Sequence, residues 1–321
     1  MYLVTGGAGF IGSHIVRRLV AMGERVRVLD NFSFGKQENL RRLENEVEVI
    51  FGDLLDQGVV RKAMEGMQAV FHEAALRSGP FSLDNPVLVN RVNVEGTVNV
   101  LIAARDAGVR RVVYASSSSV YGNGIGLPKN EQQIPSPISP CAVSKLTGEY
   151  YCRLFTELYG LETVSLRYFN VYGPRQDSDS QHAAVIPRFI NWALRGEPLE
   201  VQGNGLQSRD FTFVDNVVAA NLLAAHSRDV TDGVYNVGQG NACTLLDLID
   251  LLQDILGTEL LVLHTAARPG DVRQTLADIS RAQCCLGYRP QVSFEEGLLR
   301  TVEYFGRQMG LGLRRDSRPI L

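Results

Sequence analysis

The segment Thr5-Gly6-Gly7-Ala8-Gly9-Phe10-Ile11-Gly12 follows a short apolar run and opens an amphipathic stretch. Glycines at this spacing permit a tight turn and the close approach of a pyrophosphate, while the following helix offers free N–H groups and its positive dipole end. Asp30 lies 18 residues beyond Gly12, near the spacing of a ribose-binding carboxylate. We therefore predict a dinucleotide-binding unit, and this context disfavours the alternative of a purely structural glycine-rich turn.

The rest of the first half alternates short apolar runs with helical patterns. The runs are Tyr2–Thr5, Val26–Asp30, Val47–Asp53, Ala69–Ala75 and Arg111–Ser117. Short runs without polar alternation indicate strands that are buried on both faces, as in a parallel sheet. We predict an α/β fold with a doubly wound parallel sheet of the Rossmann type. Residues 1–169 should mainly form the NAD-binding domain, and residues 170–321 a smaller, interleaved C-terminal substrate lobe, where prolines and glycines interrupt the pattern.

Composition narrows the class of protein. The 321 residues carry a net charge of -3, which gives no reason to expect a nucleic acid or a membrane surface as partner. We see no signal peptide and no apolar stretch of bilayer length, so we expect a cytoplasmic protein. Five cysteines without a C-x-x-C pair predict reduced thiols and no metal site. We expect the adjacent Cys284 and Cys285 to be small buried residues.

Asp30 also distinguishes between cofactors. A carboxylate here would repel a 2′-phosphate, and no Arg or Lys occurs in Asn31-Phe32-Ser33, so the sequence favours NAD over NADP. We expect the next two strand ends to contribute adenine neighbours and small residues beneath the dinucleotide. The residues that we predict to bind the cofactor on these grounds are Gly6, Gly9, Phe10, Ile11, Gly12, Asp30, Asn31, Asp53, Leu54, Ala74 and Ala75.

A series of motifs carries a family resemblance over nearly the whole length. In order they read TGGAGFIG, DNFSFG, GDLLD, YASSSSVYG, SPCAVSKLTGE, RYFNVYGPRQ, SRDFTFVDN and RPGDVR. The chain resembles the extended short-chain dehydrogenases/reductases, especially their UDP-N-acetylhexosamine epimerase and dehydratase group. The resemblance implies NAD as cofactor and a UDP-sugar, such as UDP-N-acetylglucosamine, as partner. It also adds Asn93, Ser116, Lys145 and Tyr168 to the cofactor-binding residues.

The chain departs from this family at its catalytic group, which consists of Ser or Thr, Tyr and Lys. The resemblance assigns the serine to Ser117 and the lysine to Lys145, but Cys141 occupies the position of the tyrosine. A thiol ionises at lower pH than a phenol, and more readily still beside a lysine. It is also shorter by a whole ring. Either the sugar moves, another base serves it, or the chemistry is lost.

Neighbouring positions bear on the reaction. The family's sugar 4,6-dehydratases carry an Asp-Glu pair where this chain has Ser118 and Ser119. Glu131 is the best remaining carboxylate for proton transfer if it points inward, and otherwise it anchors a loop. Our main hypothesis is a UDP-N-acetylglucosamine 5,6-dehydratase with transient C4 oxidation, in which Cys141, Lys145, Ser117 and Glu131 are catalytic. The alternatives are a UDP-N-acetylhexosamine 4-epimerase and a non-catalytic NAD and nucleotide-sugar sensor.

The resemblance also predicts a binding surface for the nucleotide sugar. Thr275 holds a position where a small side chain leaves room for an N-acetyl group at C2. The full set of predicted substrate-binding residues is Arg77, Ser78, Ser117, Ser118, Asn170, Val185, Ile186, Arg188, Gln202, Arg209, Arg268, Asp271 and Thr275. Members of the family often pair through two long helices, so we expect a homodimer through the helices near Val92–Ala104 and Ala142–Leu158.

Overall fold

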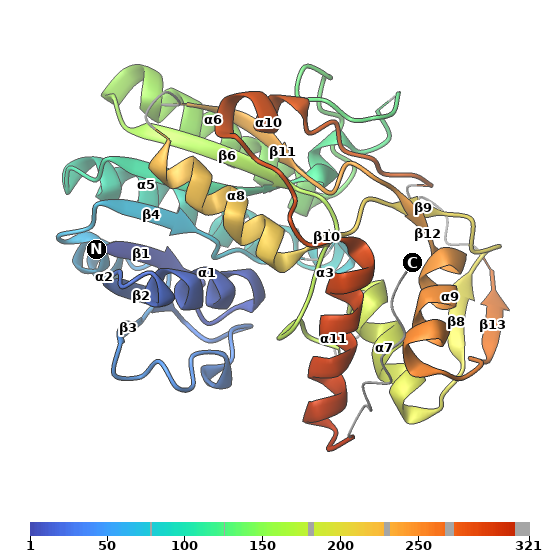
Figure 1. Ribbon diagram of the computed structural model, residues 1–321. Coiled ribbons are helices and arrows are strands. Elements are labelled where there is room, and N and C mark those ends of the chain that lie inside the picture. Colours follow the sequence, from blue (N-terminus) through green and yellow to red (C-terminus); the bar gives the residue numbers. More distant parts are fainter. Residues whose placement is uncertain (78, 125, 179–182, 228–231, 267–272, 312–321) are drawn as a thin grey trace.

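A seven-stranded parallel sheet organises the first part of the chain (Figure 1). The computed structural model describes residues 1–311, apart from 78, 125, 179–182, 228–231 and 267–272. In spatial order the strands are β3 (Val47–Phe51), β2 (Val26–Asp30), β1 (Tyr2–Thr5), β4 (Ala69–His72), β5 (Arg111–Ser117), β6 (Glu162–Tyr168) and β11 (Asp232–Val237). Every neighbouring pair is parallel. The order reverses between β1 and β4, which confirms the predicted doubly wound α/β fold.

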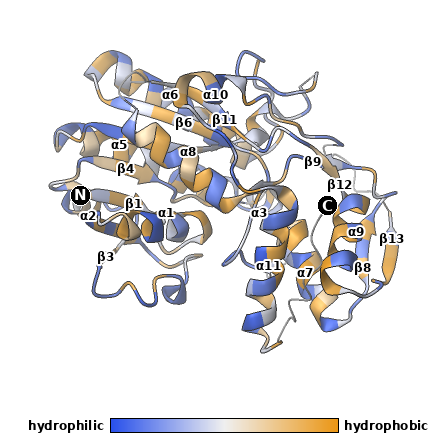
Figure 2. Cartoon of the chain, viewed as in Figure 1, coloured by the Kyte–Doolittle hydropathy of each residue, from blue (hydrophilic) through white to orange (hydrophobic). Residues whose placement is uncertain are grey.

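Helices cover both faces of this sheet. One layer contains α1 (Phe10–Ala21) and α8 (Val214–His226), and the other contains α2 (Gln57–Met64), α5 (Gly96–Asp106) and α6 (Pro140–Tyr159). Neighbouring residues of β1 serve opposite layers, since Val4 packs in the core with Ile15 of α1 and Leu3 packs in the core with Met64 of α2. Both strand faces are therefore apolar, as the colouring of Figure 2 shows for the central strands.

Helix α6 owes its position to clear end signals. Ser139 caps its first turn by accepting a bond from the Ala142 N–H at 3.2 Å, and Pro140 occupies the first position, where no N–H is needed. Gly160 ends the helix with φ of 70°. Because side chains four positions apart share a helix face, Cys141, Lys145 and Glu149 follow one another along one side of α6.

A smaller lobe packs around a second core. Its larger helices are α7 (Val185–Arg195), α9 (Leu245–Leu256) and α11 (Phe294–Gln308). Beside them lies the parallel pair β8 (Leu199–Gln202) and β13 (Val262–Thr265), of which β13 is the exposed strand. Its short strand pairs are β7 (Val171–Tyr172) with β10 (Thr212–Phe213), and β9 (Ser208–Arg209) with β12 (Cys243–Thr244). The chain returns to the large sheet in α8, β11 and α10 (Ser280–Leu286). The two units are thus interleaved.

The remaining short elements lie between the main ones. They are η1 (Gln37–Asn39), α3 (Gly79–Asp84), α4 (Pro86–Asn90), the π-helical η2 (Arg91–Glu95) and η3 (Ser118–Tyr121). Two of them, α4 and η2, form with α5 one nearly continuous helical run before β5.

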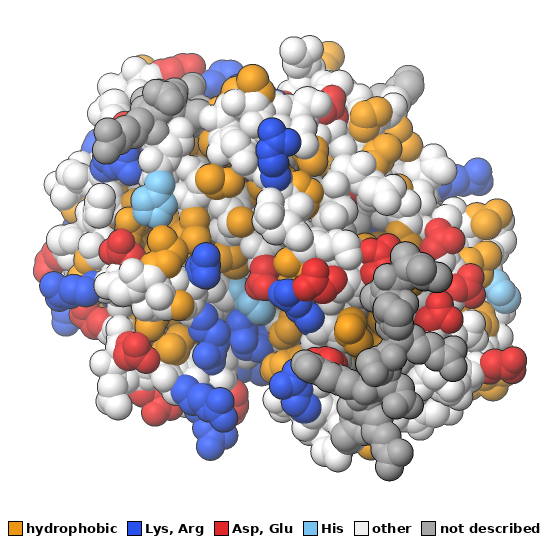
Figure 3. Space-filling model, in the orientation of Figure 1, with side chains coloured by type: hydrophobic (Ala, Val, Ile, Leu, Met, Phe, Trp, Pro, Cys, Tyr) orange, Lys and Arg blue, Asp and Glu red, His pale blue; other side chains and the backbone are white. Residues whose placement is uncertain are grey.

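Polar contacts hold the lobe against α1. The Nε2 atom of His14 bonds to the carbonyl oxygen of Pro174 at 2.9 Å, and Arg175 donates to the hydroxyl of Ser13 at 3.1 Å. Burial lowers the pKa of His14, so its imidazole is neutral near pH 7. Figure 3 shows both signs of charge on this face, with Lys and Arg gathered along the lower edge of the sheet unit and a hollow beside the lobe.

The expectation that Cys284 and Cys285 are buried was wrong. Both thiols are exposed, because the short helix α10 turns Ala282 and Leu286 inward and leaves the residues between them on its outer side. Within the described part of the chain, no helix combines the length and the hydrophobicity needed to span a bilayer.

Helix α6 has an apolar stripe on its outer side. Val143, Tyr150, Leu154 and Leu158 are exposed along it. These residues fall within one of the two helices that we expected to form a homodimer, and dimerisation through them stays a prediction.

Candidate cofactor and sugar site

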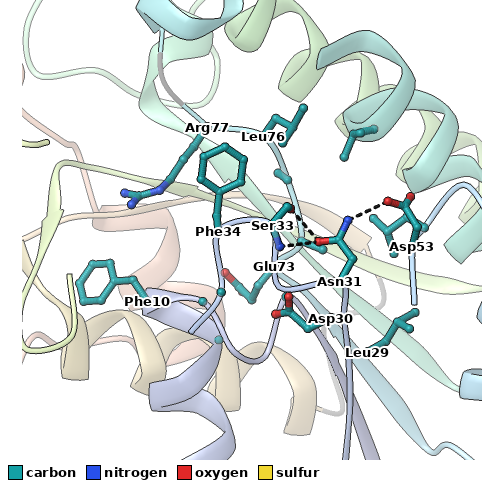
Figure 4. A pocket seen from close by; sticks show the side chains of 18 of the residues that line it. Phe10, Leu29, Asp30, Asn31, Ser33, Phe34, Asp53, Glu73, Leu76 and Arg77 are labelled. Carbon is teal, nitrogen blue, oxygen red and sulfur yellow. Dashed lines mark hydrogen bonds between the residues drawn. The ribbon is translucent and has the colours of Figure 1, made fainter. Parts of the chain in front are cut away.

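A cavity of about 320 Å³ lies at the carboxyl ends of the central strands, beside the N-terminus of α1 (Figure 4). This is where ligands bind in open α/β sheets, at the point where the strand order reverses. Eleven residues predicted from the sequence to bind the cofactor line it together, namely Gly6, Gly9, Phe10, Ile11, Gly12, Asp30, Asn31, Asp53, Leu54, Ala74 and Ala75. Arg77, predicted to contact the sugar, lines it too.

The glycine-rich turn leaves a cradle that larger residues would fill. Gly6 has φ of 68°, and a Cβ atom there would lie 2.7 Å from the Ala74 nitrogen. A Cβ atom on Gly12 would collide with the carbonyl oxygen of Gly6. Gly9 caps α1 without any side-chain hydrogen bond, so the first N–H groups of the helix remain available to an anion. These features fit the pyrophosphate of a dinucleotide.

The Asp30 carboxylate connects the glycine-rich turn to the end of β2, where Asp30 lies. Its carboxylate accepts bonds from the Ala8 N–H at 2.9 Å and from the Phe32 N–H at 2.8 Å. Burial raises the pKa of Asp30, although both backbone bonds oppose this by favouring the charged form. Asn31 donates to Asp53 at 2.7 Å, which fixes the next two strand ends relative to each other. Asp30 thus lines the cavity, and its contact with the ribose hydroxyls stays a prediction.

Replacing Asp30 with alanine should weaken NAD binding by about tenfold or more, because hydrogen bonds to a charged acceptor contribute about 1.5–3 kcal/mol each. The same change should narrow the preference for NAD over NADP, since the repulsion of the 2′-phosphate disappears. Isothermal titration with both dinucleotides checks this, with Asp254→Ala on the exposed face of α9 as control. Unchanged NAD affinity in Asp30→Ala would contradict the assignment.

Lys145 and Cys141 occupy successive turns of α6 next to the cavity. The buried Lys145 ammonium donates to the Ala115 carbonyl of β5 at 2.6 Å, and burial lowers its pKa. The Cys141 thiol donates to the carbonyl of Leu76 at 3.7 Å, and Leu76 lines the cavity. The residues predicted to be catalytic on α6 are therefore close to the strand ends that hold the cofactor cradle.

Ser117 ends β5 and caps the N-terminus of η3. Its hydroxyl oxygen accepts bonds from the Ser119 N–H at 3.1 Å and from the Ser119 hydroxyl at 2.9 Å. Its own proton is not used in either bond, so it can still donate to a ligand. Ser118 follows it as the first residue of η3 and is partly exposed.

The other cofactor-binding residues inferred from the family contact the protein rather than the cavity in the described structure. Ser116 donates to Glu149. Asn93 bonds to both backbone groups of Leu76 and to Ser144, which fastens the loop after β4 to α6. Tyr168 donates to Glu73 at 2.8 Å. These three residues therefore support the side chains and loops around the cavity. Their direct contact with the cofactor stays a prediction.

A buried ion pair supports this side of the site. Arg167 and Glu149 are 4% and 3% exposed and lie 2.7 Å apart. The Arg167 guanidinium also lies 4.7 Å from the ring centre of Tyr121, whose hydroxyl donates to Asn236 at 2.7 Å. With Ser116 bonded to Glu149, this network fixes the end of β5 and therefore the neighbouring Ser117.

Glu131 anchors a loop. Its carboxylate accepts a bond from the backbone N–H of Asn236 in β11 at 2.7 Å, and burial raises its pKa. Of the two roles that the sequence left open, this contact favours the loop anchor, because the oxygen is already satisfied by a strand that closes the far edge of the sheet. A catalytic role for Glu131 stays an untested prediction.

Two predicted sugar-binding residues meet at the entrance to the lobe. Asn170 donates to the Thr275 hydroxyl at 2.9 Å, and the same hydroxyl accepts from the Asp210 N–H at 3.2 Å. The Asp210 carboxylate holds three backbone N–H groups, of Gln239, Gly240 and Ala277. The positions of Asn170 and Thr275 are thus fixed by backbone groups of segments that are distant in sequence. No local sequence pattern specifies this contact.

The remaining predicted substrate residues are spread over the lobe. Val185 and Arg188 lie in the first turn of α7, and the Arg188 guanidinium is 4.9 Å from the ring centre of Trp192. Ile186 is 1% exposed and belongs to the core of the lobe, so its predicted contact with a ligand stays a prediction. Gln202 ends β8 and Arg209 lies in β9, each partly exposed. Ser78, Arg268 and Asp271 fall outside the described residues.

The sequence reasoning missed one ionisable residue of the cavity. Glu73 directly follows β4 and lies between Asp30 and Phe10 in Figure 4. A carboxylate next to the small pair Ala74-Ala75, at the end of a buried strand, was the signal that could have revealed it. Other lining residues that we did not predict are Leu29, Ser33, Phe34, Gly35, Gly52, Leu76, Phe81, Leu88 and Val92.

The family is now defined. The sequence profile of the NAD dependent epimerase/dehydratase family matches residues 2–238, and this chain belongs to that family of enzymes. NAD is its cofactor, as the family and NAD-bound structural neighbours support, and the glycine-rich cradle fits it. When bound, NAD would be held by the glycine turn, the N-terminus of α1 and Asp30.

Similar proteins cover almost the whole chain. The UDP-glucose 4-epimerase of Mycolicibacterium smegmatis is 39% identical, with 94% of this chain and 97% of the relative aligned. The structure of UDP-N-acetylglucosamine 4-epimerase from Methanobrevibacter ruminantium, in complex with UDP-N-acetylmuramic acid, is 41% identical with a TM-score of 0.92 and coverages of 96% and 98%. That of the Thermus thermophilus UDP-glucose 4-epimerase with NAD is 38% identical with a TM-score of 0.86, covering 95% and 98%.

Proposed function

We propose that the protein is an NAD-dependent 4-epimerase of UDP-N-acetylhexosamines. The observation that carries the proposal is the retention of Lys145 and Ser117 beside a complete cofactor cradle, in a chain so similar to UDP-sugar 4-epimerases over its whole length. When bound, NAD would serve as the hydride acceptor and then the hydride donor for a transient oxidation at sugar C4. Thr275, which bonds to Asn170, supports an N-acetylated sugar, because in the family that the chain resembles a small residue at this position leaves room at C2.

The residues of the chain would handle the proton that accompanies this oxidation. Ser117 keeps a donor for the C4 oxygen, and the Lys145 ammonium stabilises negative charge in its surroundings. Cys141 occupies the position where the family's tyrosine would accept the proton of the C4 hydroxyl, and a thiolate can also accept this proton. The proton returns from the thiol when C4 is reduced, so the epimer has the mass of the substrate.

The second candidate is a UDP-N-acetylglucosamine 5,6-dehydratase, and Cys141 itself favours it. The thiol ends a ring length short of a phenol oxygen, so a sugar that reaches it must sit deeper, with C5 or C6 nearest. A C4 ketone acidifies the C5 proton, a base removes that proton, and the 6-hydroxyl leaves as water to give a 5,6-alkene once C4 is reduced again. The chain also resembles hexosamine 5,6-dehydratases of tunicamycin-type antibiotic biosynthesis at its motifs.

Incubation of the protein with UDP-N-acetylglucosamine, followed by mass spectrometry and NMR, tests the proposal. We expect a product of unchanged mass with inverted C4, and slower conversion of UDP-glucose. A product lighter by one water would replace the epimerase by the dehydratase. Binding of NAD and the UDP-sugar without any product would instead show a sensor and would contradict both enzymatic proposals.

A further inference from the structure

Glu73 is a carboxyl group inside the cofactor cavity that the proposed chemistry does not use. It follows β4, where its backbone N–H bonds to the Thr5 carbonyl at 3.2 Å and so continues the pairing with β1. Its side chain lines the cavity together with the glycine turn, and its carboxylate accepts a bond from the Tyr168 hydroxyl. A carboxyl group at this depth is costly unless its charge is compensated.

The position of Glu73 identifies which part of the dinucleotide it faces. Asp30, Asn31 and Asp53 mark the adenosine half, at the ends of β2 and β3. The pyrophosphate belongs at the N-terminus of α1. The other half must therefore extend across β4 toward β5 and β6, where Lys145 and Tyr168 lie. Glu73 is on that nicotinamide side of the turn.

We propose that Glu73 makes this cavity favour the oxidised over the reduced nicotinamide cofactor, because its carboxylate places negative charge near the nicotinamide ring. The oxidised ring is cationic and the reduced ring is neutral, so a nearby carboxylate stabilises only the first. Glu73 is thus a residue that tunes the cofactor equilibrium, and the inference rests on NAD binding rather than on the identity of the sugar.

The groups around Glu73 determine its charge. Burial raises its pKa to about 7, against the opposing effects of the bond from Tyr168 and the positive charge of Lys145. Lys145 approaches from α6 and Tyr168 from β6, while Asn221 of α8 bonds to Tyr168. The neighbouring His72 is neutral, because burial lowers its pKa to about 3. The charge of Glu73 therefore changes near neutral pH.

The sign of the pH dependence follows. Above about pH 7 Glu73 is a carboxylate and favours the cationic ring, and below it the carboxyl is neutral and the preference fades. Equilibrating the full-length protein with mixtures of NAD⁺ and NADH, and measuring the ratio retained, reports the relative affinity without any turnover. We expect the preference for NAD⁺ to rise by about tenfold between pH 6 and pH 8.

Matched variants separate charge from structure. Glu73→Gln keeps the shape and an acceptor for Tyr168 but should make the ratio independent of pH. Tyr168→Phe removes the hydrogen bond and keeps the carboxyl, so the pH dependence should persist. Glu46→Gln, at an exposed turn, should behave as the parent protein. An unchanged pH dependence in Glu73→Gln, or none in the parent protein, would overturn the proposal.

A measurement on the parent protein avoids any effect of substitution on folding. Infrared spectra of protein with ¹³C-labelled glutamate carboxyls follow protonation directly. We expect a buried carboxyl to titrate at higher pH in the NADH complex than in the NAD⁺ complex, because the neutral ring no longer stabilises its charge. Identical titration in the two complexes would contradict the proposal even if turnover proceeds normally.

Discussion

Replacement of Lys145 by methionine is expected to lower turnover by roughly 100- to 1,000-fold, the range for loss of a preorganised charge in an active site. Its ammonium is buried between α6 and the end of β5, and it acts on the charges of both Cys141 and Glu73. Methionine has a similar length and is apolar, so the fold should survive. Steady-state rates together with thermal unfolding check both halves of the expectation.

Lys62→Met on the exposed face of α2 is the matched control, because it removes one lysine from the surface of the same domain. It should leave rate and unfolding temperature unchanged. Turnover of Lys145→Met within tenfold of the parent protein would show that this ammonium is not part of the chemistry.

Replacement of Cys141 by alanine is expected to slow turnover by about 100-fold or more, the usual contribution of a general acid–base group. The thiol is the only group of the proposed catalytic set that differs in type from the family pattern, and it bonds to the cavity residue Leu76. Full-length protein with Cys284→Ala, which changes an exposed thiol on α10, is the control. Initial rates and product masses provide the measurement.

The variant Cys141→Tyr makes the test sharper. It restores the side chain that the family carries, so a 4-epimerase should retain or gain activity with a product of unchanged mass. If the protein is instead a dehydratase that depends on the short thiol, Cys141→Tyr should abolish the elimination of water and form the C4 epimer. Normal activity of Cys141→Ala would show instead that the proton acceptor lies elsewhere, with Glu73 as the next group to examine.

The proposed chemistry depends on a supporting layer as much as on these side chains. Ser117 ends a strand whose position is fixed by the ion pair of Arg167 with Glu149 and by the bond from Ser116 to Glu149. Removing one partner of a buried pair commonly costs about 3–5 kcal/mol, because the other charge is left alone. A loss of activity after substitution here would therefore need a stability measurement beside it.

The sequence by itself determined the cofactor half of the protein. A glycine turn between a strand and a helix is local, and so is the spacing to Asp30, because both follow from consecutive residues in one βαβ unit. The predicted strands formed for the same reason, since apolar runs without alternation are required wherever helices cover both faces of a sheet. The eleven residues predicted to bind the cofactor line one cavity, and their contact with the cofactor stays a prediction.

Tertiary structure alone decided how distant residues serve that site. Glu131 reaches β11, and Asn170 meets Thr275 across about a hundred positions of sequence. Glu73 lies beside Lys145 and Tyr168 only because β4, β5 and β6 are neighbours in the sheet. The same holds for the exposure of Cys284 and Cys285, which depends on how α10 rests on the sheet unit. The charge state and the burial of a side chain depend on how segments distant in sequence pack against each other. The residues adjacent to it along the chain do not specify this packing.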